Sequence, residues 1–204
     1  MTVVYDTSSV VDSDVDKSLD KTAELTCQQY GELGMKFVDS TYNSAVGLTF
    51  NKVHIYCTKT GSTTHEIIAR YYDSGDGCST VAHATAWTND TGIGTNKAWF
   101  TLEFSSPITI AEGDRLMFAI KLYHTGQKIH IWGDSSTNID GLNYEYLYNS
   151  TWTDGGTYGW HIKLENTSSG GGSGGGSSEG DEPLDDGSSF NPEVLQILQI
   201  GVPR

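Results

Sequence analysis

The sequence has few basic residues, and this shortage excludes several kinds of partner. Its 204 residues include 12 Lys and Arg against 26 Asp and Glu, a formal net charge of -14 at pH 7. A charge of this sign favours solubility and opposes contact with nucleic acid or anionic membranes. The chain also lacks a run of about 18 apolar residues, the length that a membrane-spanning helix needs. We therefore expect no nucleic-acid partner and no membrane insertion.

Cysteine is scarce as well, with Cys27, Cys57 and Cys78 as the three examples. An odd number argues against a complete disulfide framework, and the absence of a Cys-x-x-Cys pair argues against a structural zinc site. Two states stay open: one disulfide, for example between Cys57 and Cys78, or buried free thiols.

Catalytic motifs are missing. The sequence contains no His-Glu-x-x-His, no Gly-x-Ser-x-Gly and no phosphate-binding glycine loop before a helix. Two carboxylates for glycoside hydrolysis meet only in space, with Glu66, Glu103 and Glu145 as candidates, and the alternative is that all three are solvated side chains. We expect no enzymatic activity.

Alternating short strands dominate the middle of the chain. Val53, Ile55 and Cys57 alternate with His54 and Tyr56, a period of two that indicates a sheet packed on one side. Runs of this kind predict strands near 24–30, 33–38, 48–57, 64–72, 80–87, 97–104, 115–123, 127–132, 143–148 and 158–165. Because no helical period separates them, we predict an all-β fold, an antiparallel two-sheet β-sandwich of the jelly-roll type.

Composition divides the chain into four parts. Residues 1–21 form an acidic N-terminal arm, either flexible or paired to a sheet edge, and residues 22–165 form the sandwich domain. Residues 166–188 form a Gly/Ser and acidic linker, which is a flexible coil by composition. Residues 189–204 form an apolar C-terminal docking tail.

The tail has the signals of a short helix. Asn191 suits the N-cap, Pro192 the first helical position and Gly201 the C-terminal stop. So short a helix is not stable alone in water, so the tail is expected to dock on a partner. The predicted partner-docking residues are Phe190, Val194, Leu195, Ile197, Leu198 and Ile200.

Aromatic residues offer a second kind of binding surface. The predicted glycan contacts are Trp152, Tyr146, Tyr148 and Tyr158, with Trp152 as the tryptophan expected to be exposed. The alternative for most tryptophans is a place in the core between two sheets, which we expect for Trp87, Trp99, Trp132 and Trp160.

No cofactor is expected, although Asp73 and Asp76 place hard oxygens in one turn and are weak candidates for calcium. Three Asn-x-Ser/Thr sequences, at Asn89, Asn149 and Asn166, lie in predicted turns where a glycan would be accessible.

The order of short motifs resembles jelly-roll modules of phage and archaeal-virus structural proteins and of microbial surface proteins. The resemblance covers residues 22–165 and rests on structural motifs at 34–37, 53–56, 59–62, 67–72, 99–102, 108–113, 119–122, 132–135, 149–152 and 159–163. It implies adhesion, glycan contact or decoration of a particle surface, and no enzymatic activity. It carries over no functional residue, because the class shares a core rather than a site.

These observations predict a virion structural, decoration or fibre-type protein, anchored to a capsid or tail protein by its C-terminal peptide. One tail binds modestly, so firm attachment requires many copies, and we expect a homo-oligomer. The alternatives are a carbohydrate-binding or adhesion module, and an engineered fusion in which the tail is a peptide ligand for its own or a neighbouring sandwich. Residues 1–6 have no signal-peptide pattern, and the expected location is a virion surface or the extracellular space.

Overall fold

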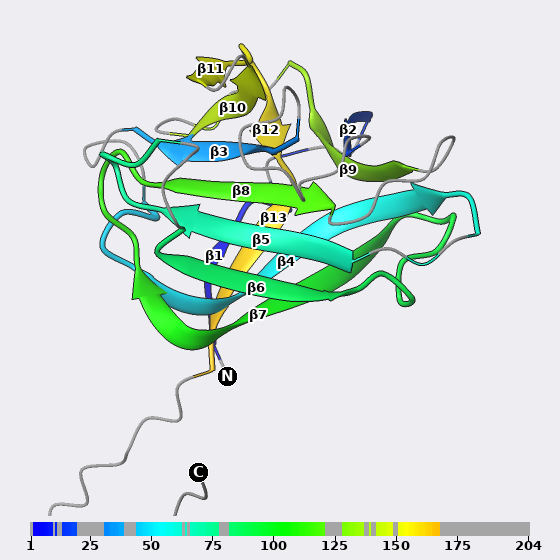
Figure 1. The fold of residues 1–204 in the computed structure, drawn as a ribbon, viewed down its shortest axis with the longest axis horizontal. Helices are drawn as coiled ribbons and strands as arrows, with labels where there is room; N and C mark the ends of the chain where they lie inside the picture. Colours follow the sequence, from blue (N-terminus) through cyan, green and yellow to red (C-terminus); the bar gives the residue numbers. More distant parts are fainter. Residues whose placement is uncertain are drawn as a thin grey trace, which may run out of the picture. The chain divides into compact units, whose positions relative to one another are not determined.

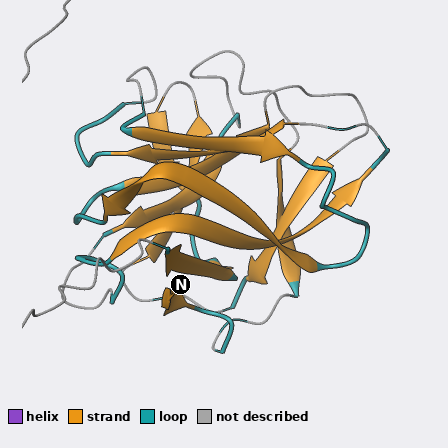
Figure 2. Ribbon diagram, turned by 90° about the horizontal axis from the view of Figure 1, so that it is seen from below, coloured by secondary structure: helices purple, strands orange, loops and turns teal. Residues whose placement is uncertain are grey.

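A computed structural model describes residues 2–9, 11, 14–19, 31–38, 44–62, 64, 66–77, 82–120, 128–136, 139, 142–148 and 151–167. Within these residues the regular structure is all β and contains no helix, as Figure 2 shows. Accordingly, no helix that could cross a membrane is found in the described part of the chain. The strands form two antiparallel sheets, which confirms the predicted all-β, two-sheet class.

One sheet, called sheet A, has seven strands. They are β1 (Thr2–Asp6), β2 (Val15–Leu19), β4 (Thr49–Thr60), β7 (Ala98–Thr109), β9 (Lys128–Asp134), β12 (Gly159–Trp160) and β13 (Ile162–Asn166). Their order is β1-β13-β4-β9-β12, with β7 paired to β4 and β2 paired to β9. The long strand β4 therefore lies between β13 and β7 (Figure 1).

The other sheet, called sheet B, has six strands. They are β3 (Leu33–Phe37), β5 (Glu66–Tyr72), β6 (Ala84–Asn89), β8 (Arg115–Ile120), β10 (Leu142–Tyr148) and β11 (Thr151–Asp154). Their order is β11-β10-β3-β8-β5-β6, so β8 is central and β6 is an edge strand.

The core fills the space between the sheets with side chains from alternate positions. Val53, Ile55 and Cys57 of β4 point inward, as the period of two predicted. Cys57 is a buried free thiol, whereas Cys27 and Cys78 lie outside the described residues. Strand β8 differs from the expected one-sided pattern, because Met117 on its other face is also fully buried.

Most predicted strands overlap observed ones, but β1, β2 and β11 (Thr151–Asp154) lie outside the predicted strand ranges. Strands β1 and β2 pair with β13 and β9, so sheet A includes residues that the sequence assigned to the arm 1–21. The predicted strand 158–165 is two strands, β12 and β13, interrupted at His161. The predicted strand 24–30, the linker from residue 168 and the docking tail lie outside the described residues.

Two positions in the fold require glycine, one in a turn and one where two strands approach closely. Gly113 has a φ of 88° in the turn before β8, a backbone region that L side chains rarely adopt. Gly34 lies where β3 passes β8, and a β-carbon there would collide with the Leu116 carbonyl group. The close approach of these two strands thus depends on a missing side chain.

Candidate functional site

The outer face of sheet A carries a compact group of aromatic rings, which we call the aromatic cluster. It consists of Tyr56 on β4, Trp99 on β7 and His161 between β12 and β13. The ring centroids are 5.2 Å apart for Tyr56 and Trp99, 4.8 Å for Tyr56 and His161, and 4.9 Å for Trp99 and His161. All three side chains are partly exposed, so ring surface is available to a ligand.

The cluster is extended by a cation. The Lys163 ammonium lies 4.5 Å from the Trp99 ring centroid and 3.4 Å from an Asp6 carboxylate oxygen. A cation over an aromatic face is attracted by the ring quadrupole, so this contact holds both side chains in place.

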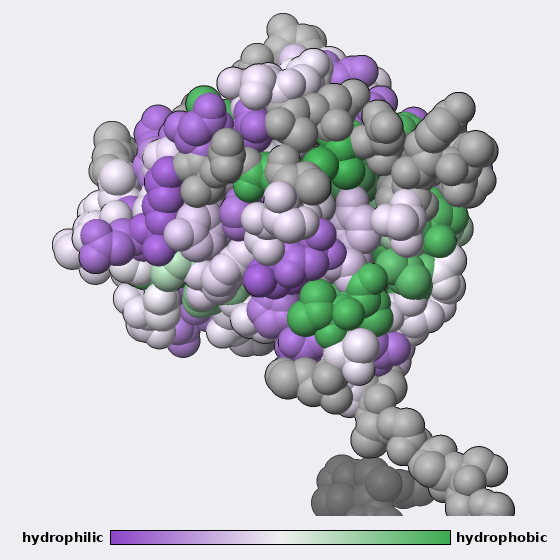
Figure 3. All heavy atoms as spheres, turned by 180° about the vertical axis from the view of Figure 1, so that it is seen from behind, coloured by the Kyte–Doolittle hydropathy of each residue, from purple (hydrophilic) through white to green (hydrophobic). Residues whose placement is uncertain are grey.

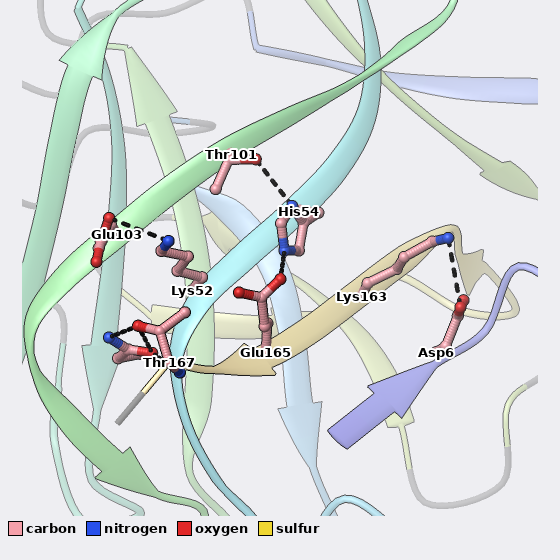
Figure 4. Close-up of polar contacts among 9 residues, drawn as sticks. Asp6, Lys52, His54, Thr101, Glu103, Lys163, Glu165 and Thr167 are labelled. Atoms are coloured by element: carbon pink, nitrogen blue, oxygen red, sulfur yellow. Dashed lines mark hydrogen bonds and ion pairs between the residues drawn. The ribbon is translucent and has the colours of Figure 1, made fainter. Parts of the chain in front are cut away.

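A polar chain runs beside the cluster across three strands (Figure 4). His54 Nδ1 lies 2.8 Å from the Thr101 hydroxyl oxygen, and His54 Nε2 lies 3.2 Å from a Glu165 carboxylate oxygen. With its proton on Nε2, the imidazole donates to Glu165 and accepts from Thr101. Hydroxyl, imidazole and carboxylate are the three groups of a nucleophile with its general base.

The surroundings of Thr101 do not complete a site for acyl transfer. Thr101 lies within β7 and is directly paired with His54 of β4, so the neighbouring amides that face β4 belong to the strand ladder. An oxyanion hole needs donors that point at the reacting oxygen, and amides committed to the ladder do not provide them. The polar chain links β7, β4 and β13 through side-chain hydrogen bonds.

Lys52 and Lys163 on this face are both paired with carboxylates. Lys52 Nζ lies 3.5 Å from a Glu103 carboxylate oxygen, and Lys163 pairs with Asp6 (Figure 4). Figure 3, which views the side opposite to Figure 1, shows hydrophobic and hydrophilic areas next to each other. A mixed surface whose lysines are paired suits a neutral polar ligand better than a polyanion.

A second group of polar side chains on sheet A, between β2 and β9, contains Ser, His and Asp. His130 Nδ1 lies 2.6 Å from an Asp16 carboxylate oxygen and 3.1 Å from the Ser18 hydroxyl oxygen. Both partners contact the same ring nitrogen, whereas a catalytic triad needs them on opposite nitrogens. These hydrogen bonds link β2 to β9.

The outer face of sheet B holds buried charges. Glu32 pairs with Arg70 and accepts hydrogen bonds of 3.0 and 3.1 Å from the Tyr72 hydroxyl group, and burial raises the pKa of the Glu32 carboxyl. Arg115 Nε donates to a Glu145 carboxylate oxygen at 2.6 Å. In both pairs a buried carboxylate lies against a cation of opposite sign, which offsets part of the cost of burial.

The three carboxylates considered for glycoside hydrolysis do not come together. Glu103 is on sheet A, whereas Glu66 and Glu145 are on β5 and β10 of sheet B. Strands β5 and β10 are three positions apart in that sheet, about 14 Å at the usual strand spacing. A glycosidase pair is separated by roughly 5 to 9.5 Å, so this arrangement does not fit.

The predicted glycan contacts occupy three different environments. Tyr158 is fully buried in the core and its hydroxyl group donates to the Ile131 carbonyl oxygen at 2.9 Å, so it has no surface for a ligand. Trp152 is partly buried against Tyr72, at a centroid distance of 5.2 Å. Tyr146 is partly buried against the core, and the Tyr148 side chain lies outside the described residues.

The exposed tryptophan is Trp87, which the sequence assigned to the core. It is 65% exposed on the edge strand β6, whereas Trp160 is fully buried as expected and Trp99 and Trp132 are intermediate. The alternation within β6 explains the correction, because Ala86 takes the inward position next to it.

The turn with the candidate calcium ligands is held by its own hydrogen bonds. An Asp76 carboxylate oxygen accepts from the Asp73 amide at 3.0 Å, and the Asp73 carboxylate lies 3.4 Å from His83 Nδ1. Among the described residues, no group of three or more His, Cys, Asp or Glu is arranged to hold a metal ion.

Sequence reasoning missed the aromatic cluster. The outward position of Tyr56 follows from the alternation in β4, but the cluster depends on the register that brings Trp99 and His161 to either side of it. The docking residues Phe190, Val194, Leu195, Ile197, Leu198 and Ile200 lie outside the described residues.

Comparison of the chain with models of known protein families, with curated proteins and with solved structures finds no match.

Proposed function

We propose that the chain is a non-enzymatic display protein of a virion or a similar particle. In this proposal a jelly-roll head is joined by the Gly/Ser linker to a C-terminal helix that docks on a capsid or tail protein. The head is displayed on the particle surface, and the tail attaches it to the particle.

The observation that carries the proposal is the order of strands in the two sheets. Sheet A contains the order β1-β13-β4-β7, and sheet B contains β3-β8-β5-β6. A jelly roll with eight strands has this arrangement, in which the chain changes sheet at every step except from β5 to β6 and the last strand returns beside the first. Strands β2, β9, β10, β11 and β12 are additions to it. Jelly rolls are frequent in viral capsid and lectin domains, which supports display rather than catalysis.

The energetics of the tail favour attachment in many copies. Burial of five aliphatic side chains contributes about 7–15 kcal/mol to binding, before the cost of ordering the tail is subtracted. Ordering ten residues costs roughly 10 kcal/mol or more, so one tail binds modestly. Several tails on one oligomer gain from a high effective concentration, which supports the proposal of a homo-oligomeric head.

Particle association with and without the tail tests this function. Particles are purified by density gradient from cells that produce either the full chain or the chain lacking residues 179–204. The full chain should sediment with the particles, and the shortened chain should stay in the soluble fraction with unchanged circular dichroism. If the shortened chain sediments equally well, the docking role of the tail is wrong. If neither chain sediments with particles, the display function is wrong.

A matched pair of variants separates the apolar face of the tail from its polar face. Replacing Leu195 and Leu198 by Asp should abolish sedimentation with particles, because charges then occupy the docking side. Replacing Gln196 and Gln199 by Ala should leave it intact, because these residues share the remaining face. Equal loss in both variants would contradict docking through an apolar helix face.

Carbohydrate binding is the second candidate, and the aromatic cluster favours it. Partly exposed rings beside hydrogen-bonding side chains suit a sugar, which has apolar C–H faces and hydroxyl edges. Trp99→Ala should remove binding on a glycan array, whereas Trp152→Ala, on the other sheet, should preserve it. An array without any signal for the unaltered chain would exclude this role.

A further inference from the structure

Trp87 presents a large aromatic surface to solvent, as few large hydrophobic side chains among the described residues do. Its indole is 65% exposed on the edge strand β6, and Asn89 follows on the same face of that strand. Residues two apart in a strand share a face at a distance of about 7 Å. Asn89 is exposed as well, so the two side chains form one small accessible surface.

The turn after β6 is anchored at Asp90, the residue between Asn89 and Thr91. Asp90 is fully buried and its carboxylate lies 3.1 Å from Lys59 Nζ. The Ile93 amide donates to the Asp90 carbonyl oxygen at 2.8 Å and closes the turn. Because Asp90 points inward, Asn89 before it and Thr91 after it are both exposed.

Thr91 orients the Asn89 side chain. Its hydroxyl group donates to Asn89 Oδ1 at 2.5 Å, and its amide donates to the same oxygen at 3.3 Å. With Oδ1 held on the side of Thr91, the amide nitrogen Nδ2 is directed away from the turn. Asn89-Asp90-Thr91 is an acceptor sequence for N-glycosylation, with the hydroxyl residue in contact with the acceptor.

We propose that Asn89 is an N-glycosylation site and that Trp87 is the surface on which the first sugar of the glycan packs. The indole is amphipathic and flat, and the apolar face of a pyranose can cover it. Of the three acceptor sequences, Asn89 alone has an aromatic residue two positions before it. The residue two positions before Asn149 is Leu147, and the residue two positions before Asn166 is Leu164. The proposal does not depend on the particle function.

The modification uses a lipid pyrophosphate-linked oligosaccharide as co-substrate. Asn89 Nδ2 forms a bond to the anomeric carbon of the first sugar, and the bond from this carbon to the pyrophosphate oxygen breaks. The lipid pyrophosphate leaves with the bonding electrons, and the amide nitrogen gives up one proton. Asn89 keeps its carbonyl oxygen, so the contact from Thr91 survives in the product.

Occupancy is tested by producing the full chain in the secretory pathway of a eukaryotic cell and measuring glycopeptide masses. Asn89 should be occupied, and Thr91→Ala should abolish occupancy there while leaving the other two acceptor sequences unchanged. An unmodified Asn89, whether or not Asn149 or Asn166 is modified, overturns the proposal.

The role of Trp87 is tested by comparing glycosylated and unglycosylated protein, each with Trp or Ala at position 87. The glycan should raise the midpoint of thermal unfolding when Trp87 is present and not in Trp87→Ala, a non-additivity that reports direct contact. The protons of the first sugar should also shift upfield in NMR spectra because of the indole ring current. Thr85→Ala, which lies on the same face of β6, is the control and should preserve both effects. An equal rise in midpoint and unshifted sugar protons with and without Trp87 would contradict the packing.

Discussion

Two lysines on strand β4 show how burial determines the contribution of an ion pair to the free energy of unfolding. Lys59 pairs at 3.1 Å with Asp90, which is fully buried, whereas Lys52 pairs at 3.5 Å with Glu103, whose side chain is 56% exposed. Water screens the second pair, and an exposed pair contributes at most about 1 kcal/mol. A buried acid left without its partner is far more costly.

Lys59→Met should therefore lower the free energy of unfolding by about 3 kcal/mol or more. The control Lys52→Met keeps the same side-chain length and should lower it by less than about 1 kcal/mol. Urea unfolding at neutral pH measures both values. Similar losses in the two variants would show that the burial of Asp90 does not control stability.

Buried acids of high pKa make the protein sensitive to alkali. Burial raises the pKa of the Cys57 thiol from 9.0 to about 12, with a contribution from the charge of Asp90, and burial raises the pKa of Tyr5 to about 12. The pKa values of Tyr71, Tyr72 and Tyr158 are also raised, chiefly by burial. These groups hold their protons more tightly in the folded chain than in the unfolded chain.

The free energy of unfolding should consequently fall as the pH rises from about 9 toward 12, since the unfolded chain loses these protons first. Below the unfolded pKa values this stabilisation is fully present. Each group that titrates in this range removes about 1.4 kcal/mol per pH unit. Urea unfolding at a series of pH values checks the slope, and Cys57→Ala should flatten its first part, below the range of the tyrosines. A constant free energy up to about pH 11 would contradict the raised pKa values.

Single residues were the hardest to predict from the sequence. The aromatic content suggested an exposed tryptophan, but Trp87 rather than Trp152 is the most exposed. Side-chain exposure depends on whether a strand is an edge strand and on what packs over its outer face, and neither property is encoded locally. Tyr158 illustrates the same limit, because a strand-end tyrosine looks accessible until its core neighbours are known.

At the scale of elements, the packing of β3 against β8 depends on Gly34. A β-carbon at this position would meet the backbone of Leu116 and Met117, which cannot yield as a flexible side chain does. Gly34→Ala should cost about 1–3 kcal/mol in the free energy of unfolding. The matched control is Gly75→Ala in an exposed turn with open space around it, which should change the free energy by less than about 0.5 kcal/mol. The midpoints of thermal unfolding of the two variants test this prediction. Equal midpoints would show that β3 and β8 can move apart to accommodate the added β-carbon.

Most strands from β3 onward overlap strands that the sequence predicted, whereas β1, β2 and β11 do not. Alternation identified β4 and β8 because each has a continuous inner row of apolar residues. Strands β1 and β2 are short, β2 is rich in polar residues, and each pairs with a strand far away in the sequence, β13 and β9 respectively. Such pairing is a long-range property, so the local composition of residues 1–21 left a flexible arm and an edge-pairing arm equally open.

For the whole molecule, the sandwich should be stable without its C-terminal extension. Met1–Gly170 forms one compact unit, and the described core lies entirely within it. A Glu-specific protease should cut first after Glu179, in the acidic part of the linker, whereas Pro183 blocks cleavage after Glu182. The remaining sandwich should keep the thermal midpoint of the full chain, measured by calorimetry. A large loss of midpoint would mean that the extension contributes to the fold.

The pairing of β13 also decides how the head responds to a pulling force. The linker leaves the sandwich just after Asn166, and β13 is bonded to β1 on one side and to β4 on the other. A load transmitted through the linker therefore enters an internal strand, and two ladders must break before the strand comes away. An edge strand such as β6 would peel from a single neighbour. Single-molecule stretching from the C-terminus should thus meet a higher unfolding force than stretching from a residue in β6.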